Sequence, residues 1–319
     1  MYTMPLYCKL RSYRFNWDCP KVSVSLHCIM ARQALEYPWP FRFLRMAFPY
    51  LEKLVPGFAH SLAIRLFLIP IRFRAKPADL EAAKTFDQYT IKVGEEDLVV
   101  YSKGEGPEVL CLHGWSGKAM QFRRIAERLV QEGYRCVLVD APGHGRSTGG
   151  RTSIFEFQAA FNQVFETLQQ PVAVVGHSLG AASISLAVHD GTEVPSFAVF
   201  GAPVVGEDIL QEFRNRVNAS ESTTDHLKER AIKEFGRTFE SVTMQETFKA
   251  VNCPCIGFHG VNDLDAPVYH LDVLKEVNPR IETHKYEGVG HRRILKDDVV
   301  IDDFIVWLNR QKESLTTGP

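Results

Sequence analysis

The stretch Pro171-Val-Ala-Val-Val-Gly-His-Ser-Leu-Gly180 decides the fold. An apolar, β-branched run leads into it, and a segment of small residues suited to a helix follows Ser178. Gly176 and Gly180 flank the serine at the two positions where a side chain would crowd a sharp turn from strand to helix. Such a turn exposes the hydroxyl, which becomes a nucleophile when a base within reach takes its proton. We therefore predict Ser178 as a nucleophile on an elbow formed with Gly176 and Gly180.

Two later loops supply the base and the acid that such a serine requires. One is Glu287-Gly-Val-Gly-His291, whose glycines can swing an imidazole over a sheet edge, and the other is His259-Gly-Val-Asn-Asp263-Leu-Asp265-Ala-Pro267. We predict that His291 is the general base and that Asp263 orients it. Composition does not choose between Asp263 and Asp265. Position favours Asp263, and the place of Asp265 near Pro267 predicts that it caps the following helix.

Backbone amides must also face the oxygen on which negative charge develops. The amide of Leu179 directly follows the nucleophile. Trp115 lies in Leu110-Cys-Leu-His-Gly-Trp-Ser-Gly117, where a strand-like run breaks into a glycine-containing loop. We predict an oxyanion hole formed by the backbone N–H groups of Trp115 and Leu179, and a structural role for His113.

Beyond Pro77, strand-like runs alternate with amphipathic helical stretches, which is typical of a mostly parallel, doubly wound α/β sheet. The first two runs resemble a hairpin. Residues 206–252 are charged and helix-rich with no strand-like run, and they predict a small helical lid. The expected strands are Tyr89–Val93, Leu98–Tyr101, Val109–Leu112, Arg135–Val139, Val172–Val175, Phe197–Phe200, Cys255–Phe258 and Glu282–Tyr286. The expected helices are Met120–Glu132, Ile154–Leu168, Leu179–His189, Val268–Val277 and Val299–Arg310.

Residues 1–76 form a basic, aromatic-rich extension ahead of a catalytic domain at 77–319. Twelve Lys or Arg against three acidic residues give the extension a charge of +9, whereas the whole chain carries −1. Residues 41–75 predict one or two short helices, which either pack on the catalytic domain or make peripheral contact with an anionic membrane. The first thirty residues lack the apolar core of a secretory signal, and no run reaches transmembrane length. No nucleic-acid-binding module is recognisable in the basic arm.

Seven cysteines without a framework spacing favour a reducing, cytoplasmic compartment, with the inner face of a membrane as the site of any peripheral contact. Cys253 and Cys255 alternate along one expected strand, so their side chains point to opposite faces. The pair is therefore not expected to bind a metal, and the sequence implies neither a metal nor an organic cofactor.

The motifs in chain order resemble the α/β-hydrolase superfamily over residues 85–312. A further motif, Asp140-Ala-Pro-Gly-His-Gly-Arg-Ser147, belongs to the same series as the motifs quoted above. Its Asp140 and His144 are expected to be structural. The resemblance implies Ser178, Asp263 and His291 as the catalytic residues, and a carboxylic ester hydrolase acting on a small ester or acyl substrate. A thioesterase or a carbon–carbon bond hydrolase would use the same triad. A non-catalytic binding protein on this fold is the alternative from a different class.

Overall fold

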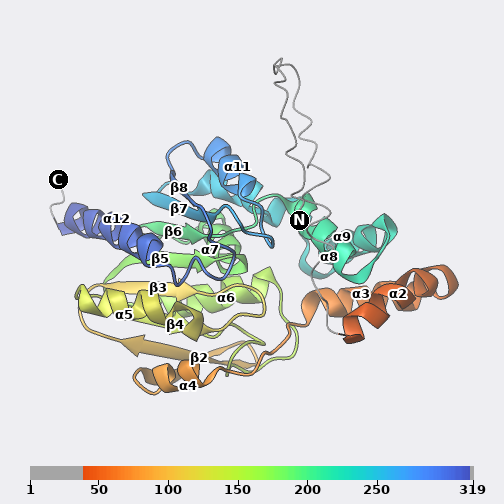
Figure 1. The fold of residues 1–319 in the computed structure, drawn as a ribbon, viewed down its shortest axis with the longest axis horizontal. Helices are drawn as coiled ribbons and strands as arrows, with labels where there is room; N and C mark the ends of the chain where they lie inside the picture. Colours follow the sequence, from red (N-terminus) through yellow and green to blue (C-terminus); the bar gives the residue numbers. More distant parts are fainter. Residues whose placement is uncertain (1–38, 317–319) are drawn as a thin grey trace, which may run out of the picture. The chain divides into compact units, whose positions relative to one another are not determined.

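The structure is a computed structural model that describes residues 39–316 (Figure 1). Half of the basic N-terminal extension, residues 1–38, lies outside the described residues, as do residues 317–319. The described part contains an eight-stranded sheet with the order β1-β2-β4-β3-β5-β6-β7-β8. Its strands are β1 Asp87–Val93, β2 Glu96–Lys103, β3 Glu108–Leu112, β4 Arg135–Val139, β5 Pro171–His177, β6 Phe197–Phe200, β7 Cys255–Gly260 and β8 Glu282–Tyr286.

Strand directions follow the pattern expected from the sequence. β1 and β2 form an antiparallel hairpin that turns at Gly94, whose φ of 57° suits glycine. β2 is antiparallel to β4, and the pairs from β4 and β3 through to β8 are all parallel. Parallel pairs require crossover connections, which helices provide here. The prediction of a mostly parallel, doubly wound sheet is confirmed.

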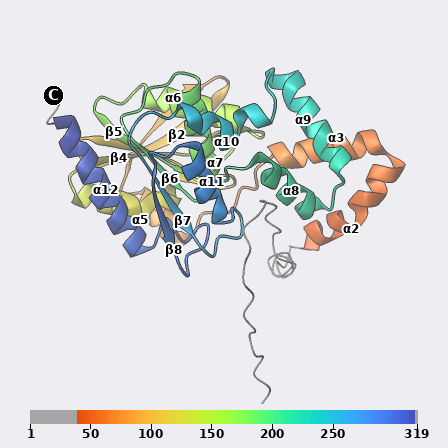
Figure 2. The same cartoon turned by 90° about the horizontal axis from the view of Figure 1, so that it is seen from above.

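Helices cover both faces of the sheet. Side chains alternate along the central strands, so Val109 and Cys111 join the core beneath α5 and α12, whereas Leu110 and Leu112 join the core beneath α6, α7 and α11. Figures 1 and 2 show these two layers. The covering helices are α5 Arg123–Gln131, α6 Ile154–Phe165, α7 Leu179–His189, α11 Tyr269–Val277 and α12 Asp298–Thr316, with α4 Pro77–Ala83 at the edge near β1 and a 3-10 turn at Ala119–Phe122.

Four helices lie beside the sheet and form what we call the cap: α2 Trp39–Leu54, α3 Pro56–Leu68, α8 Gly206–Val217 and α9 Glu221–Phe235 (Figures 1 and 2). The helix-rich character of residues 206–252 is confirmed. The last part of that insertion, with α10 Met244–Thr247 and 3-10 turns at Glu240–Val242 and Phe248–Ala250, returns to α7, where Met244 and Phe248 join the sheet core. Of the helices in residues 206–252, α8 and α9 lie in the cap, whereas α10 packs on the sheet domain.

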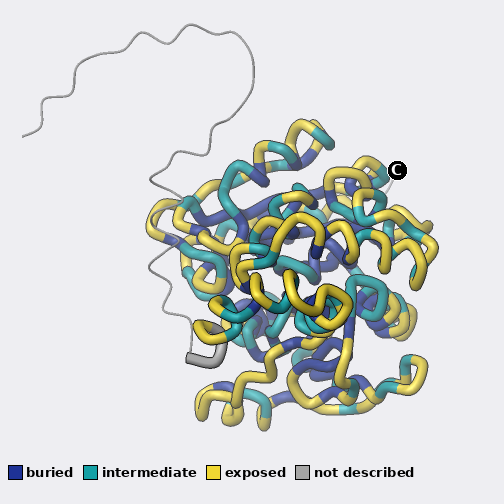
Figure 3. Tube along the Cα trace, turned by 90° about the vertical axis from the view of Figure 1, so that its right-hand side faces the viewer, coloured by how far each residue is buried: buried dark blue, intermediate teal, exposed yellow. Residues whose placement is uncertain are grey.

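The cap has its own apolar core. Phe48 of α2 and Ala59 and Ala63 of α3 are fully buried against Phe213 of α8 and Leu227 of α9. The sequence predicted one or two short helices over residues 41–75, and the structure has two, which pack chiefly on the insertion rather than on the sheet. Figure 3, which views the molecule from the cap side, shows exposed turns in front of buried strands.

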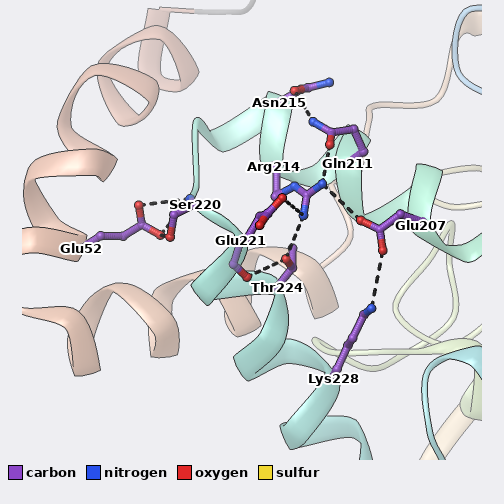
Figure 4. Close-up of polar contacts among 9 residues, drawn as sticks. All are labelled: Glu52, Glu207, Gln211, Arg214, Asn215, Ser220, Glu221, Thr224 and Lys228. Atoms are coloured by element: carbon purple, nitrogen blue, oxygen red, sulfur yellow. Dashed lines mark hydrogen bonds and ion pairs between the residues drawn. The ribbon is translucent and has the colours of Figure 1, made fainter. Parts of the chain in front are cut away.

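Polar contacts join the two halves of the cap (Figure 4). Glu52 of α2 accepts hydrogen bonds from the backbone N–H and the hydroxyl of Ser220, at 3.0 and 2.8 Å, just before α9. A carboxylate at a helix N-terminus is stabilised by the unpaired amides there. Within α8, Arg214 contacts Glu207 at 3.1 Å, and the same guanidinium reaches Thr224 of α9 at 3.3 Å.

Candidate functional site

Ser178 lies on the turn between β5 and α7, with φ 53° and ψ −122°. This backbone conformation is rare for a residue with a side chain and marks a strained position. Its amide donates to Phe200 O at 3.0 Å, which anchors the turn to the neighbouring strand β6. The predicted strand-to-helix turn is present, and the Ser178 side chain remains partly exposed at its tip.

The two elbow glycines are required by close backbone approaches. A Cβ on Gly176 would lie 2.3 Å from Ala181 Cα, and one on Gly180 would lie 2.2 Å from Leu112 O. A Cβ on Gly114 would lie 2.7 Å from Ser178 Cβ. The loop after β3 therefore passes directly beside the predicted nucleophile, as the expected position of Trp115 requires.

His291 and Asp263 meet across two loops at the carboxyl ends of β7 and β8. His291 Nδ1 lies 2.8 Å from Asp263 Oδ2. Asp263 is buried, and its other oxygen, Oδ1, accepts from the amides of Asp265 and Ala266 at 2.9 and 2.8 Å. These two hydrogen bonds fix the orientation of the carboxylate. The carboxylate in turn keeps the proton on His291 Nδ1 as a hydrogen-bond donor and leaves Nε2 as the nitrogen able to accept a proton.

His177 makes a contact with the His291 loop that the sequence did not predict. Its Nε2–H donates to the carbonyl oxygen of His291 at 2.9 Å, and the two rings lie 4.7 Å apart. Burial, then the nearby His291, lowers the pKa of His177 well below its usual range, so this ring is neutral. The only sequence signal was its place directly before Ser178. His177 thus links the elbow to the loop that carries His291.

Two buried histidines hold the loop around Trp115. His113 Nδ1–H donates to Gly114 O at 2.8 Å, and its Nε2 accepts from Ala141 N at 3.1 Å. His144 Nδ1–H donates to Pro142 O at 2.9 Å, and its Nε2 accepts from Ser116 N at 2.8 Å. Each ring uses one nitrogen as donor and the other as acceptor, which only the neutral form can do.

Burial sets the charge state of both rings. It lowers the pKa of His113 to about 4. It also lowers the pKa of His144 to about 3, and the neighbouring His113 lowers it further. Asp140 is buried beside them and accepts from Ala119 N at 2.7 Å and Arg146 N at 2.9 Å. These contacts fit the structural roles expected for His113, Asp140 and His144.

Arg72 also reaches this region, although the sequence analysis placed it in the N-terminal extension. Its guanidinium donates to the carbonyl oxygens of Gly143, Ser147 and Gly149, at 2.8, 3.0 and 2.5 Å. The adjacent Ile71 N donates to Ser116 Oγ at 3.0 Å. The linker after α3 is therefore bound to both loops beside the elbow, and no sequence pattern reveals that contact.

Asp265 corrects one expectation. The helix after it begins at Tyr269 with Val268 at its N-cap and no side-chain cap, so Asp265 does not cap it. The Asp265 side chain is exposed and pairs with Arg216 of α8 at 3.4 Å. The prediction was wrong because Val268, the N-cap residue, already has helical backbone angles, and the chain ahead of it turns with the amides of Asp265 and Ala266 bonded to Asp263.

Solved structures share this architecture. An esterase from Pyrococcus furiosus superposes with a TM-score of 0.56 over 78 % of this chain and 97 % of its own, at 18 % sequence identity. The chain has the α/β-hydrolase fold. Residues 109–253 also match the sequence model of the alpha/beta hydrolase family. The resemblance indicated by the motifs is therefore confirmed.

Curated relatives match shorter stretches of this chain. A pimeloyl-[acyl-carrier protein] methyl ester esterase of Chromobacterium violaceum is 40 % identical over 85 residues, which are 26 % of this chain and 32 % of the relative. Lipase 3 of a Moraxella species is 27 % identical over 146 residues, which are 43 % of this chain and 44 % of the relative. The chain thus spans less than half of the length of these relatives.

Two further features of the described residues concern metals and membranes. Among residues 39–316, no three His, Cys, Asp or Glu side chains gather as candidate metal ligands. Within the same described range, no helix has both the length and the apolar character needed to cross a bilayer.

Proposed function

We propose that the protein is a serine hydrolase that cleaves carboxylic esters through an acyl-enzyme on Ser178. The observation that carries the proposal is the 2.8 Å contact between His291 Nδ1 and Asp263 Oδ2, and His177, which directly precedes Ser178, hydrogen-bonds to the carbonyl oxygen of the same His291. The names of the matched relatives, a methyl ester esterase and a lipase, support the ester class.

In the first half of the reaction, Ser178 Oγ attacks the ester carbonyl carbon while His291 Nε2 takes the hydroxyl proton. Asp263 stabilises the imidazolium through the bond at Nδ1. The carbonyl oxygen gains the negative charge and is bound by the backbone N–H groups of Leu179 and Trp115. Leu179 begins α7, so its amide has no partner within the helix and adds to the positive end of the helix dipole.

The attack of Ser178 on the ester carbonyl forms a tetrahedral intermediate, which then breaks down to the acyl-enzyme. The bond between the carbonyl carbon and the alcohol oxygen breaks, and His291 gives its proton to the leaving alcohol. In the second half, a water molecule loses a proton to His291 Nε2 and attacks the acyl carbon. The bond between that carbon and Ser178 Oγ then breaks, His291 returns its proton to Ser178 Oγ, and the acid is released. Each oxyanion donor of this kind is worth about 3 kcal/mol of barrier lowering.

The test combines covalent labelling with turnover. A fluorophosphonate probe is expected to label the wild-type chain and Ser222→Ala, a matched control at an exposed serine of α9, but not Ser178→Ala. A panel of p-nitrophenyl esters of increasing acyl length, with matched thioesters, then defines the substrate class. Absence of labelling would favour a non-catalytic binding protein, and turnover of thioesters alone would overturn the ester assignment.

A further inference from the structure

An apolar stripe that the described residues leave exposed runs along α2 and continues onto the start of α3. Its side chains are between 60 % and 75 % exposed, although all are large and apolar or aromatic: Phe43, Met46, Tyr50, Leu54 and Phe58. Steps of three and four residues place the α2 members on one helix face. Exposed apolar side chains that gather in this way mark an interaction surface, whereas isolated ones need no explanation.

The stripe is separate from the face that folds the cap. On the other side of the same two helices, Phe48, Ala59 and Ala63 are fully buried, and Phe67 packs edge-on against Phe213 at 5.2 Å. The two helices are therefore apolar on two sides, of which residues 39–316 cover one.

Positive charge borders the stripe. Residues 39–76 contain seven Lys or Arg and a single acidic residue, Glu52. Glu52 turns toward α9, where it binds Ser220 (Figure 4). By helical spacing, Arg42 and Lys53 lie along one edge of the stripe on α2, and both are exposed. Its border is therefore cationic, because the segment's only carboxylate faces inward.

We propose that this face of α2 and α3 docks onto an anionic phospholipid surface, with the stripe in the headgroup region and the flanking cations on lipid phosphates. A helix that exposes aromatic and aliphatic residues between Lys and Arg has the composition of an interfacial helix. Neither helix meets the requirement for a transmembrane span, so the contact is peripheral. A second copy of the chain fits less well, since pairing two such faces would bring Arg42 and Lys53 toward their own counterparts.

The first experiment measures partitioning of the full chain into vesicles of phosphatidylcholine with about 30 % phosphatidylglycerol, using Ser178→Ala so that no hydrolysis intervenes. Met46→Gln/Leu54→Gln removes two stripe residues that are 65 % and 75 % exposed. Val299→Gln/Val306→Gln is the matched control, because both valines are 62 % exposed on α12. We expect the stripe variant to lose at least about tenfold in partition coefficient and the control to match the parent.

A second experiment tests the charge. Arg42→Gln/Lys53→Gln is expected to weaken binding at least about tenfold at low salt and to flatten its salt dependence. Circular dichroism melting checks that every variant is folded. Absence of vesicle binding by the parent, equal binding to pure phosphatidylcholine, or equal losses in the stripe variant and its control would overturn the proposal. So would a dimer seen by light scattering that Met46→Gln/Leu54→Gln dissociates, which would assign the face to a second copy.

Discussion

The paired histidines beside the elbow predict a loss of stability in mild acid. His113 and His144 are buried as neutral rings, and each accepts a backbone N–H at Nε2. Lowering the pH protonates that nitrogen freely in the unfolded chain, where the histidine pKa is near 6.5. In the folded chain the proton would face an N–H donor inside an apolar site. Acid therefore favours unfolding.

The magnitude follows from linkage. Because the folded pKa lies below the unfolded one, the unfolded state binds more protons, and stability rises with pH across the interval between them. This stabilisation is present above the unfolded pKa near 6.5 and is lost as pH falls toward 4 for His113 and 3 for His144. Between pH 7 and pH 5, each ring accounts for about 2 kcal/mol, so the pair lowers the free energy of unfolding by about 4 kcal/mol.

Urea unfolding at pH 7, 6 and 5 measures this effect. In His144→Gln the side-chain oxygen can still accept from Ser116 N but cannot titrate, so we expect the difference between pH 7 and pH 5 to shrink by about 2 kcal/mol. His284→Gln is the control, since that side chain is 42 % exposed on β8, and it should keep the full difference. A wild-type curve that is flat over this range, or an unchanged difference in His144→Gln, would refute the reasoning.

Three further predictions concern the elbow and its supports. Asp263→Asn should lower kcat by about 10⁴, as loss of the triad aspartate does in serine proteases. Asp265→Asn should keep most activity, because it loses only an exposed ion pair worth under about 1 kcal/mol. Ester kinetics with melting curves would show the reverse order of activities if Asp265 were the acid. Gly114→Ala should lower kcat about a hundredfold because the new methyl group would lie within 3.0 Å of both Ser178 Cβ and His177 O and displace the loop; activity near the wild-type level would mean that the loop position does not matter. Arg72→Gln should destabilise the protein by about 2 kcal/mol and lower kcat, because the Arg72 side chain holds the loops beside the elbow. Arg74→Gln is the control. Equal effects of the two variants in denaturation and kinetics would contradict this role.

Much of the fold follows from local patterns in the sequence. The expected strands from Tyr89–Val93 to Glu282–Tyr286 all lie within observed strands, because buried parallel strands carry apolar runs that end at turn residues. His291 and Asp263 were also placed correctly beside each other, since loops at the carboxyl ends of neighbouring parallel strands meet at one sheet edge.

What the sequence did not reveal are contacts between distant segments. The apolar side of α2 and α3 predicts that they pack but not that α8 and α9 are the partners, because hydrophobic burial has no direction. The same holds for Arg72, whose three carbonyl acceptors come from a loop about seventy residues later. His177 was missed because its role depends on the path of the His291 loop.

The two-segment cap has a consequence for synthesis on the ribosome. About 140 residues separate the end of α3 from the start of α8. At about 5–20 residues per second, the first half of the cap waits on the order of 10 s before its partner emerges. During that interval α2 and α3 expose their inner apolar face as well as the outer stripe. A nascent chain stalled before Gly206 should therefore bind chaperones, or a nearby lipid surface, more strongly than one stalled at a point where the whole of α9 has emerged from the ribosome.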